Sequence, residues 1–347
     1  MSHPQTSVVI LNWNTRGLLE RFLPEVIKNS REPGVEIVVA DNGSTDGSVP
    51  MLQKKFPEVR IVQLEKNFGF AGGYNRILQQ IKTPYTLLLN SDVAPGADWL
   101  PPLIQCMEDQ PEIAACVPKI KSAQNPEMFE YAGAAGGFID KLGYTFCRGR
   151  IFDTLEKDHG QYNASTPVFW ASGAALMVRT REYVESGGLN EHFFAHMEEI
   201  DWCWRMKNQG KTIQYIPRST IFHLGGGTLN ALSPRKNFLN FRNNLYMLYR
   251  NLPEGKVWGI ILQRILMDYL AAVRFLASGK SGHFWTIIQA HNAFFRNMSR
   301  LKKERNQLKQ KVTRPNHPET YTRSIVFDYF FKDRKYFSSL KFSNFPN

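Results

Sequence analysis

Short apolar segments alternate with amphipathic ones along the first 120 residues. The apolar runs suit strands that are buried on both faces, and the segments between them repeat apolar residues at helical spacing. The pattern predicts five strands, at 7–12, 36–40, 59–64, 85–90 and 113–117. It predicts four intervening helices, at 15–29, 46–56, 71–81 and 99–110. Such alternation indicates an α/β fold with a Rossmann-like, mostly parallel central sheet flanked by helices.

The pattern changes twice further along the chain. Glycines punctuate residues 125–168, which predicts short strands and a long loop. Regularity returns in a strand-like run at 167–179 and a helical segment at 198–208. From about residue 235 the chain is helical in pattern, basic and aromatic. We therefore expect one domain over 1–234, with two halves that meet near residue 120, and a helical basic extension over 235–347.

The charge is divided unevenly between these two regions. The chain carries 43 basic and 31 acidic residues, a net charge of +12. Residues 235–347 hold 21 of the basic and only 6 of the acidic residues, whereas residues 1–234 are slightly acidic. This asymmetry favours contact of the C-terminal region with a polyanion, either an anionic membrane surface or nucleic acid. No nucleic-acid motif is present, so we expect no nucleic-acid partner.

Composition and cysteine use point to the cytoplasm. The polar N-terminus does not resemble a secretory signal, and no uncharged apolar run is long enough to span a membrane. The apolar segment at 257–277 includes three charged residues, which favours packing on the first domain or lying in a membrane interface. The cysteines show no CxxC pair, as is typical of a reducing compartment: Cys106, Cys116, Cys147 and Cys203.

Polar residues follow four of the predicted strands. In parallel sheets ligands bind beyond the carboxyl ends of the strands, so these residues are candidates for one site. Asp41 could accept hydrogen bonds from a base or ribose, or could simply belong to a turn. Asp92 could hold a divalent cation, or could cap the next helix. The strand-end candidates are Asn12, Asn14, Asp41, Asn90, Ser91 and Asp92.

A glycine-rich run, NFGFAGGYN, opens the third predicted helix. Glycines allow close approach of a ligand to the backbone, and helix N-termini favour phosphate. The run is neither a Walker loop nor a GxGxxG motif, and a tight packing turn explains it equally well. Its candidate ligands are Asn67, Gly69, Gly72 and Asn75.

An acidic cluster lies among aromatic residues near position 200. Glu198, Glu199 and Asp201 are followed by Trp202, and carboxylates in such surroundings are typical of a pocket with shifted pKa values. A solvated helix N-terminus is the alternative. His223 precedes three glycines and could complete a cation site with Asp92, although a lone histidine is more often structural.

Seven segments in order resemble the inverting family 2 glycosyltransferases of GT-A fold, especially their bacterial rhamnosyltransferase-like branch. They cover roughly residues 5–230 and read VVILNWN, VVADNGSTDGS, NFGFAGGYN, LLLNSDV, ASGAALMVRT, GGLNEHFF–EEIDWCWR and FHLGGGT. The resemblance implies a nucleotide-binding half at 1–120 and an acceptor half at 121–234. It implies transfer of a sugar from dTDP-rhamnose or a UDP-hexose to a saccharide or lipid-linked saccharide, in cell-surface polysaccharide assembly.

The resemblance also implies roles for the candidate residues. Asn90-Ser91-Asp92 stands where the family has Asp-x-Asp, so Asp92 and His223 would bind Mg²⁺ or Mn²⁺. Glu199 would be the general base, assisted by Glu198. Nucleotide contacts would come from the strand-end and glycine-rich candidates, and acceptor contacts from Trp170, Asp201 and Trp202.

Two other functions remain open at this point. A sugar nucleotidyltransferase has a similar sheet, although the chain has Asn-Trp-Asn where that class has a Gly-, Arg- and Pro-containing signature. A noncatalytic protein that binds nucleotide sugars or carbohydrate is the second alternative. For the basic extension we favour peripheral attachment to the inner face of the cell membrane over a solvated basic face.

Overall fold

A mixed β-sheet forms the centre of the molecule. The computed structural model describes residues 4–225 and 234–342. The strands lie in the order β11-β13-β6-β12-β4-β1-β2-β3, with β5 paired to β13. Strands β4, β1, β2 and β3 are parallel, which confirms the Rossmann-like half. The strands are β1 (Thr6–Asn12), β2 (Val35–Asp41), β3 (Arg60–Gln63), β4 (Tyr85–Leu89), β5 (Val93–Pro95), β6 (Ile113–Ser122), β11 (Thr166–Pro167), β12 (Ala175–Arg179) and β13 (Thr212–His223).

The strand expected at 167–179 is divided in two. Strand β12 runs antiparallel between β4 and β6, whereas β11 pairs with β13 at the sheet edge. The intervening residues leave the sheet, and three of them, Ser172, Gly173 and Ala174, line a pocket. An apolar run alone does not reveal this break, because residues 168–171 are as buried as strand residues.

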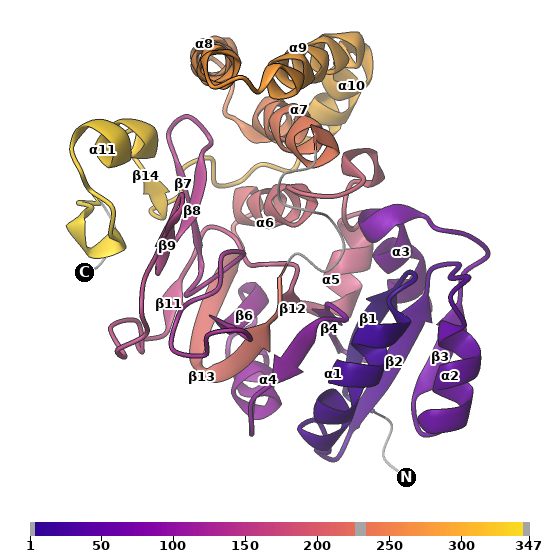
Figure 1. The fold of residues 1–347 in the computed structure, drawn as a ribbon. Helices are drawn as coiled ribbons and strands as arrows, with labels where there is room; N and C mark the ends of the chain where they lie inside the picture. The colour runs from indigo at the N-terminus through magenta and orange to yellow at the C-terminus, as the bar shows by residue number, and fades with distance from the viewer. Residues whose placement is uncertain (1–3, 226–233, 343–347) are drawn as a thin grey trace.

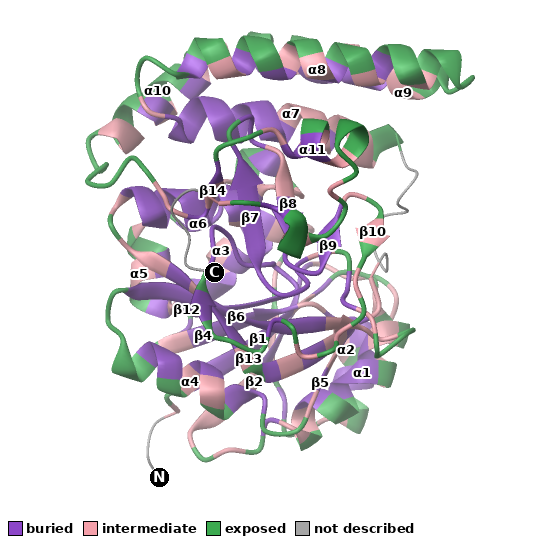
Figure 2. Ribbon diagram, turned by 90° about the vertical axis from the view of Figure 1, so that its left-hand side faces the viewer, coloured by how far each residue is buried: buried purple, intermediate pink, exposed green. Residues whose placement is uncertain are grey.

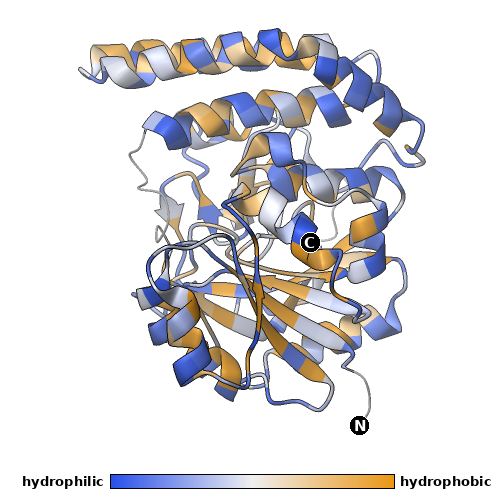
Figure 3. Cartoon of the chain, turned by 90° about the vertical axis from the view of Figure 1, so that its right-hand side faces the viewer, coloured by the Kyte–Doolittle hydropathy of each residue, from blue (hydrophilic) through white to orange (hydrophobic). Residues whose placement is uncertain are grey.

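Helices cover both faces of the sheet (Figure 1), and their apolar sides form a continuous core with the hydrophobic strands (Figure 3). The expected helix at 198–208 is confirmed with those bounds. Asp46 lies one residue before the cap of the second helix, and its carboxylate accepts hydrogen bonds from Ser48 N and Arg16 N. The helices of this part are α1 (Arg16–Lys28), α2 (Ser48–Lys55), α3 (Gly69–Leu78), α4 (Leu100–Asp109), α5 (Thr180–Glu185), η1 (Glu191–Phe193) and α6 (Glu198–Asn208).

The C-terminal region is helical, as expected, and stacks beyond α6 on the side away from the central sheet (Figure 1). Asp201 of α6 forms ion pairs with Arg205 and with Arg250 of α7, all of them buried, and this network joins the two parts. None of the described helices combines the length and apolarity that crossing a membrane requires. The helices are α7 (Pro234–Asn251), α8 (Val257–Ala277), α9 (Ser281–Arg296), α10 (Met298–Lys309), α11 (Ile325–Phe331) and η2 (Phe337–Ser339).

A second, smaller sheet combines four strands from the middle of the chain with one strand from the C-terminal region. Its order is β10-β9-β8-β7-β14, and β14 arrives from the C-terminal region to pair in parallel with β7. Asp140 at the end of β7 accepts a hydrogen bond from Ile325 N at the start of α11. The C-terminal region is thus built into the first domain rather than appended to it. The strands are β7 (Gly137–Asp140), β8 (Thr145–Cys147), β9 (Arg150–Ile151), β10 (Thr154–Leu155) and β14 (Thr320–Tyr321).

Candidate active site

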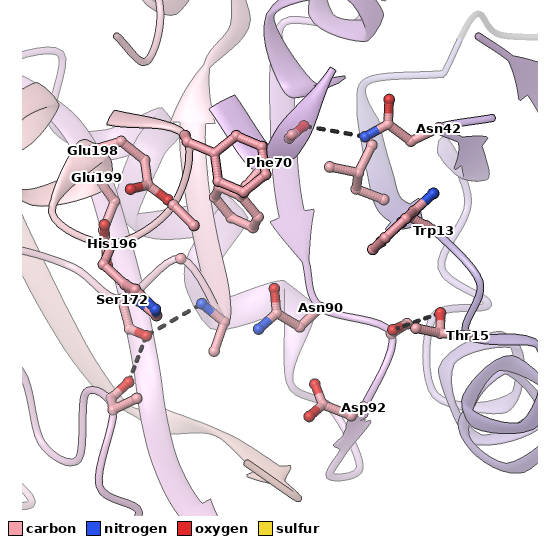
Figure 4. Close-up of a pocket in the computed structure, with 18 of the residues that line it drawn as sticks. Trp13, Thr15, Asn42, Phe70, Asn90, Asp92, Ser172, His196, Glu198 and Glu199 are labelled. Atoms are coloured by element: carbon pink, nitrogen blue, oxygen red, sulfur yellow. Dashed lines mark hydrogen bonds between the residues drawn. The ribbon is translucent and has the colours of Figure 1, made fainter. Parts of the chain in front are cut away.

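A pocket of about 450 Å³ opens where the parallel strands β1 and β4 end. Its walls include the ends of β1, β2, β4 and β13, the start of α3 and the loop before β12. They also include Ala132, the start of α6 with the segment before it, and the first turn of α7. In Figure 4, Trp13, Thr15 and Asn42 lie on one side, Glu198, Glu199 and His196 on the other, and Asn90 between them. The pocket therefore lies at the carboxyl ends of the parallel strands, where the sequence predicted a ligand site.

The pocket wall that includes Trp13 has an exposed aromatic ring beside a set of hydrogen bonds made by the Asn42 side chain. Trp13 is half exposed and lines the pocket. The Asn42 side chain donates to Gly69 O and Asn67 Oδ1, and its own carbonyl accepts from Phe68 N. These bonds fix the start of α3 against the end of β2, so the wall beside Trp13 is rigid.

Asn12 and Asp41 lie behind this wall rather than in it. Both are buried, and Asn12 Nδ2 donates to Asp41 Oδ1 at 2.8 Å. The second carboxylate oxygen of Asp41 accepts from Ser44 N. Asn14 is exposed, and its side chain accepts from Thr45 N. Within the described residues, these three side chains support the two strand ends without lining the pocket.

The glycine-rich run divides between the pocket and the core. Asn67 and Gly69 line the pocket. Gly69 has φ +73°, a conformation that favours glycine. A Cβ there would also lie only 3.2 Å from the Phe194 ring, so a larger residue would crowd that ring. Gly72 packs beside Phe68 and Arg76, and Asn75 bonds Leu189 and Tyr183. The structure therefore assigns a structural role to Gly72 and Asn75.

Asp92 and His223 meet at the floor of the pocket. His223 Nε2 lies 3.1 Å from Asp92 Oδ1, and Nδ1 lies 3.4 Å from Glu130 Oε2. Asn90 Nδ2 is 3.5 Å from the same Nε2. Burial opposes ionisation of the imidazole, but hydrogen bonding and charge from Asp92 and Glu130 outweigh it and raise the pKa of His223 to about 10. Gly226, Gly227 and Thr228 of the FHLGGGT segment lie outside the described residues.

The donor set at the floor fits a divalent cation that also binds a ligand. Asp92 Oδ1 and His223 Nε2 are an oxygen and a nitrogen donor 3.1 Å apart, and a cation between them would replace the proton that the imidazole now donates. Across residues 4–225 and 234–342, no group of three or more His, Cys, Asp and Glu converges as a metal site. An ion here would need further oxygen ligands, such as phosphate oxygens and water.

Glu198 and Glu199 begin α6 at the opposite wall. Within the described residues, one carboxylate oxygen of each is buried with no hydrogen-bond partner. Burial raises the pKa of Glu199 to about 7, although backbone N–H groups at the helix N-terminus oppose the shift. Burial, and then the charge of Glu199, raise the pKa of Glu198 well above its usual range. Glu199 is therefore the member of the pair whose pKa lies nearer to neutral pH.

The segment before α6 holds a strained backbone. Phe194, His196 and Met197 all have positive φ, at 68°, 69° and 73°. For residues other than glycine this conformation costs free energy and persists only where surrounding contacts impose it. His196 lines the pocket, and burial, reinforced by Lys236, lowers its pKa to about 4, so its imidazole is neutral.

The residues expected to contact an acceptor have other partners. Asp201 is fully buried between Arg205 and Arg250. Trp202 is fully buried, and its Nε1 donates to Ser186 Oγ. Trp170 donates to Phe138 O and packs against Gly137. None of these three lines the pocket, so the geometry gives no support to acceptor contacts from them.

Other pocket residues escaped the sequence analysis. Arg235 and Lys236 add positive charge at the first turn of α7, in the basic extension that was expected to contact a membrane surface. Trp13 is adjacent to two candidates in NWN, which is the one signal that could have identified it. Glu130 does not line the pocket but contacts His223, and it carried no signal because that contact is with a residue 93 positions later. The further lining residues are Thr15, Asn42, Phe70, Ser172 and His196.

Comparison with known proteins agrees with the fold and the motif order. The chain is 27% identical over 234 residues to an N-acetylglucosaminyl-diphospho-decaprenol L-rhamnosyltransferase of Mycobacterium tuberculosis, covering 62% of this chain and 75% of that protein. Its fold resembles GalNAc-T7 with UDP, GalNAc and Mn²⁺, with TM-score 0.57 and 16% identity over 86% of this chain and 58% of that one. It also resembles the mannosyltransferase PcManGT of Pyrobaculum calidifontis in complex with GDP-Man and Mn²⁺. That match has a TM-score of 0.52 and 12% identity and covers 90% of this chain and 86% of that one.

The family model confirms the expectation raised by the motifs. The model described as glycosyl transferase family 2 matches residues 7–168, which include β1 to β4, the glycine-rich run and Asp92. The structural likeness extends across the central sheet and the helical region. Residues 7–168 therefore match glycosyl transferase family 2, and the chain is similar to a rhamnosyltransferase at 27% identity.

Proposed function

We propose that this glycosyltransferase moves a sugar from dTDP-rhamnose or a UDP-hexose to a saccharide, with inversion, during assembly of a cell-surface polysaccharide. One observation carries the proposal: a single pocket contains an exposed aromatic ring, the Asp92–His223 pair and a glutamate with a pKa near 7. In Figure 4, Trp13 lies on one side of the pocket, Glu199 on the other, and Asp92 between and below them. They correspond to the base, the diphosphate and the reacting end of a nucleotide sugar.

The donor base would stack on Trp13. An exposed indole at a pocket edge offers a flat apolar face, and aromatic stacking is a common way to hold a nucleobase. Asn42 and Asn67 are held by each other and by the α3 backbone, so they present polar atoms at fixed positions. Asn12 and Asp41 would act indirectly, by fixing the strand ends that carry these residues.

Asp92 and His223 would hold a divalent cation, with Glu130 orienting the imidazole through Nδ1. Both solved neighbours named above contain Mn²⁺ with a nucleotide or nucleotide sugar. When bound, the cation stabilises negative charge on the departing diphosphate. Asn90 replaces the first aspartate of the family motif, so the phosphates would complete the coordination. Mn²⁺ and Mg²⁺ both satisfy this set of donors.

Arg235 and Lys236 would supply fixed positive charge to the same diphosphate. Both line the pocket from the first turn of α7. The Arg235 guanidinium also lies 4.9 Å from the centre of the Phe194 ring, in the strained segment before α6. Fixed cations that face developing negative charge lower the barrier without reorganising during the reaction.

Glu199 would act as the general base. An acceptor hydroxyl attacks the anomeric carbon, the bond from that carbon to the diphosphate oxygen breaks, and the hydroxyl proton passes to the Glu199 carboxylate. The nucleoside diphosphate leaves with the bonding electron pair. A base with a pKa near the working pH is well matched to this transfer. Glu198 would remain protonated beside it, which limits repulsion between the two acids.

A lipid-linked saccharide is the acceptor that we favour, because the M. tuberculosis relative is named for an N-acetylglucosaminyl-diphospho-decaprenol acceptor. The family assignment gives no support to the nucleotidyltransferase alternative. The test is a transfer assay with dTDP-rhamnose, UDP-glucose, UDP-galactose and UDP-GlcNAc against a short-chain GlcNAc-diphospho-polyprenol. Transfer from one donor, with inversion shown by NMR, supports the proposal. Binding of the nucleotides without transfer to this or to simple saccharide acceptors would favour the noncatalytic alternative.

A further inference from the structure

Helix α8 buries two of its three charged residues, Arg264 and Asp268, and exposes many of its large apolar ones. On its inner side, Arg264 Nε donates to Asp268 Oδ1 at 2.8 Å, and His291 of α9 lies 3.2 Å from the other oxygen of the same carboxylate. All three side chains are buried. The Arg264 guanidinium also lies 3.7 Å from the centre of the Tyr144 ring, which joins α8 to the turn between β7 and β8.

The outer side of α8 is a continuous apolar stripe. At about 100° per residue, its members fall within an arc of about 120°, so they share one face. Leu262 and Leu266 of this face are 63% and 61% exposed. Gln263 and Arg274 are the polar residues exposed on this helix, and both lie at the edge of the arc. The α8 stripe consists of Trp258, Leu262, Leu266, Tyr269, Leu270 and Val273.

The stripe continues onto α11. The Arg274 guanidinium near the end of α8 lies 5.7 Å from the centre of the Phe330 ring. Phe330 and its neighbours Phe327 and Phe331 are all at least half exposed. The exposed phenylalanines of α11 therefore lie near the end of α8, and exposed residues run along α8 at the edge of the molecule (Figure 2). A contiguous apolar patch that is exposed on a protein surface marks a site of contact with a partner or a membrane.

The charge around the stripe identifies the kind of partner. Lys256 lies just before α8, and Lys280 follows its end. Among the exposed side chains of residues 234–342, Glu254 and Asp333 are the acids. Exposed basic residues outnumber them and include Lys256, Arg274, Lys280, Arg296, Lys302 and Lys332. A second copy of the chain would bring these cationic surfaces together at a cost. Anionic headgroups above an apolar layer match both the charge and the stripe.

We propose that the α8 stripe and the α11 phenylalanines insert into the interfacial layer of an anionic membrane, with α8 parallel to its plane. Helix α8 does not qualify as a spanning helix, and its inward charges are already satisfied within the protein. It packs on α9, which packs on α7, and the first turn of α7 lines the active-site pocket. The α8 stripe is thus linked to the pocket through the contacts of α8 with α9 and of α9 with α7. The inference holds whichever sugar the protein transfers.

The test is flotation of the full chain with vesicles of phosphatidylcholine alone or with about one third phosphatidylglycerol. We expect binding to the anionic vesicles that falls at least tenfold in the variant Leu262→Gln/Leu266→Gln/Leu270→Gln. The double variant Val184→Gln/Val312→Gln, with exposed apolar residues on α5 and after α10, is the control and should bind like wild type. Truncation is a poor test, because β14 pairs with β7.

The unfolding temperature and nucleotide affinity of the triple variant distinguish loss of the membrane contact from misfolding or loss of the active site. The replaced leucines are exposed, so the triple variant should unfold at the wild-type temperature and bind nucleotide diphosphate as wild type does. Equal vesicle binding by triple variant and wild type would overturn the proposal, as would no binding of wild type to anionic vesicles. A wild-type dimer that the triple variant breaks, without vesicle binding, would assign the stripe to a second copy instead.

Discussion

The Asn243 side chain on α7 donates a hydrogen bond of 2.8 Å to the carbonyl of His196, the strained residue at the pocket wall. The same Nδ2 lies within 3.0 Å of the carbonyl oxygens of Phe193 and Ala195. Asn243 is fully buried. One amide of the C-terminal region thus holds the positive-φ segment that delivers Glu198 and Glu199 to the pocket.

Asn243→Ala should therefore reduce both stability and catalysis. Loss of the buried donor leaves carbonyls unpaired, which costs about 1–3 kcal/mol. Relaxation of the strained segment should lower kcat by roughly tenfold or more, because small misplacements of catalytic groups are costly. Denaturant unfolding and steady-state kinetics measure the two effects. Asn240→Ala, at a half-buried position on the same helix, is the matched control and should leave kcat near the wild-type value.

The rate of transfer should depend on the ionisation of Glu199. Burial raises its pKa to about 7, above the usual carboxylate range, and only the ionised form accepts a proton. We expect kcat to fall about tenfold per pH unit below pH 7 and to level off above it. A pH profile at saturating substrate measures this. Glu191→Gln, an exposed acid seven residues before Glu198, should keep the profile; a rate that is flat down to pH 5 would contradict the assignment.

Metal-dependent nucleotide binding should require both Asp92 and Glu130. Asp92→Ala removes a proposed ligand and should abolish the increase in nucleotide affinity that Mn²⁺ produces. Glu130→Gln leaves both proposed ligands in place but removes the charge that orients His223, so affinity for Mn²⁺ should fall about 10–100-fold. Calorimetry with nucleotide and Mn²⁺ measures both effects. Glu127→Gln, an exposed neighbour paired with Lys157, is the control; unchanged Mn²⁺ affinity in Glu130→Gln would remove Glu130 from the site.

The Trp13 ring should contribute to nucleotide affinity without affecting the chemical step. Trp13→Ala should weaken binding of the preferred nucleoside diphosphate about 5–10-fold, the equivalent of roughly 1 kcal/mol of stacking. Trp285→Ala removes a ring on α9 that is also exposed, at 60% against 49% for Trp13, and should have no effect. If both variants bind as wild type does, the base lies elsewhere in the pocket.

Much of this architecture follows from sequence pattern, because strand and helix periodicity are local properties. The parallel strands β1 to β4 and the bounds of α6 and α8 correspond closely to the predicted segments. The Asp92–His223 pairing was expected from the resemblance, and the structure brings the two side chains together. Whether they bind a metal stays a prediction.

What the sequence did not reveal depends on long-range contacts. Asn243 and Glu130 act on residues 47 and 93 positions away, and no periodic pattern records such pairs. Asp201 and Trp202 looked like pocket residues because they adjoin Glu199, but successive helix positions face different directions. Both point into the core, where Arg250 and Ser186 bind them.

The most direct test of the account is calorimetry and transfer kinetics on Glu199→Gln beside wild type. The amide keeps the size of the side chain but cannot take the acceptor proton. We predict that the variant binds the preferred nucleoside diphosphate with Mn²⁺ within about twofold of wild type, while transfer falls by about 10²–10⁴. Near-normal transfer by Glu199→Gln would contradict the central claim that this carboxylate is the base in the pocket.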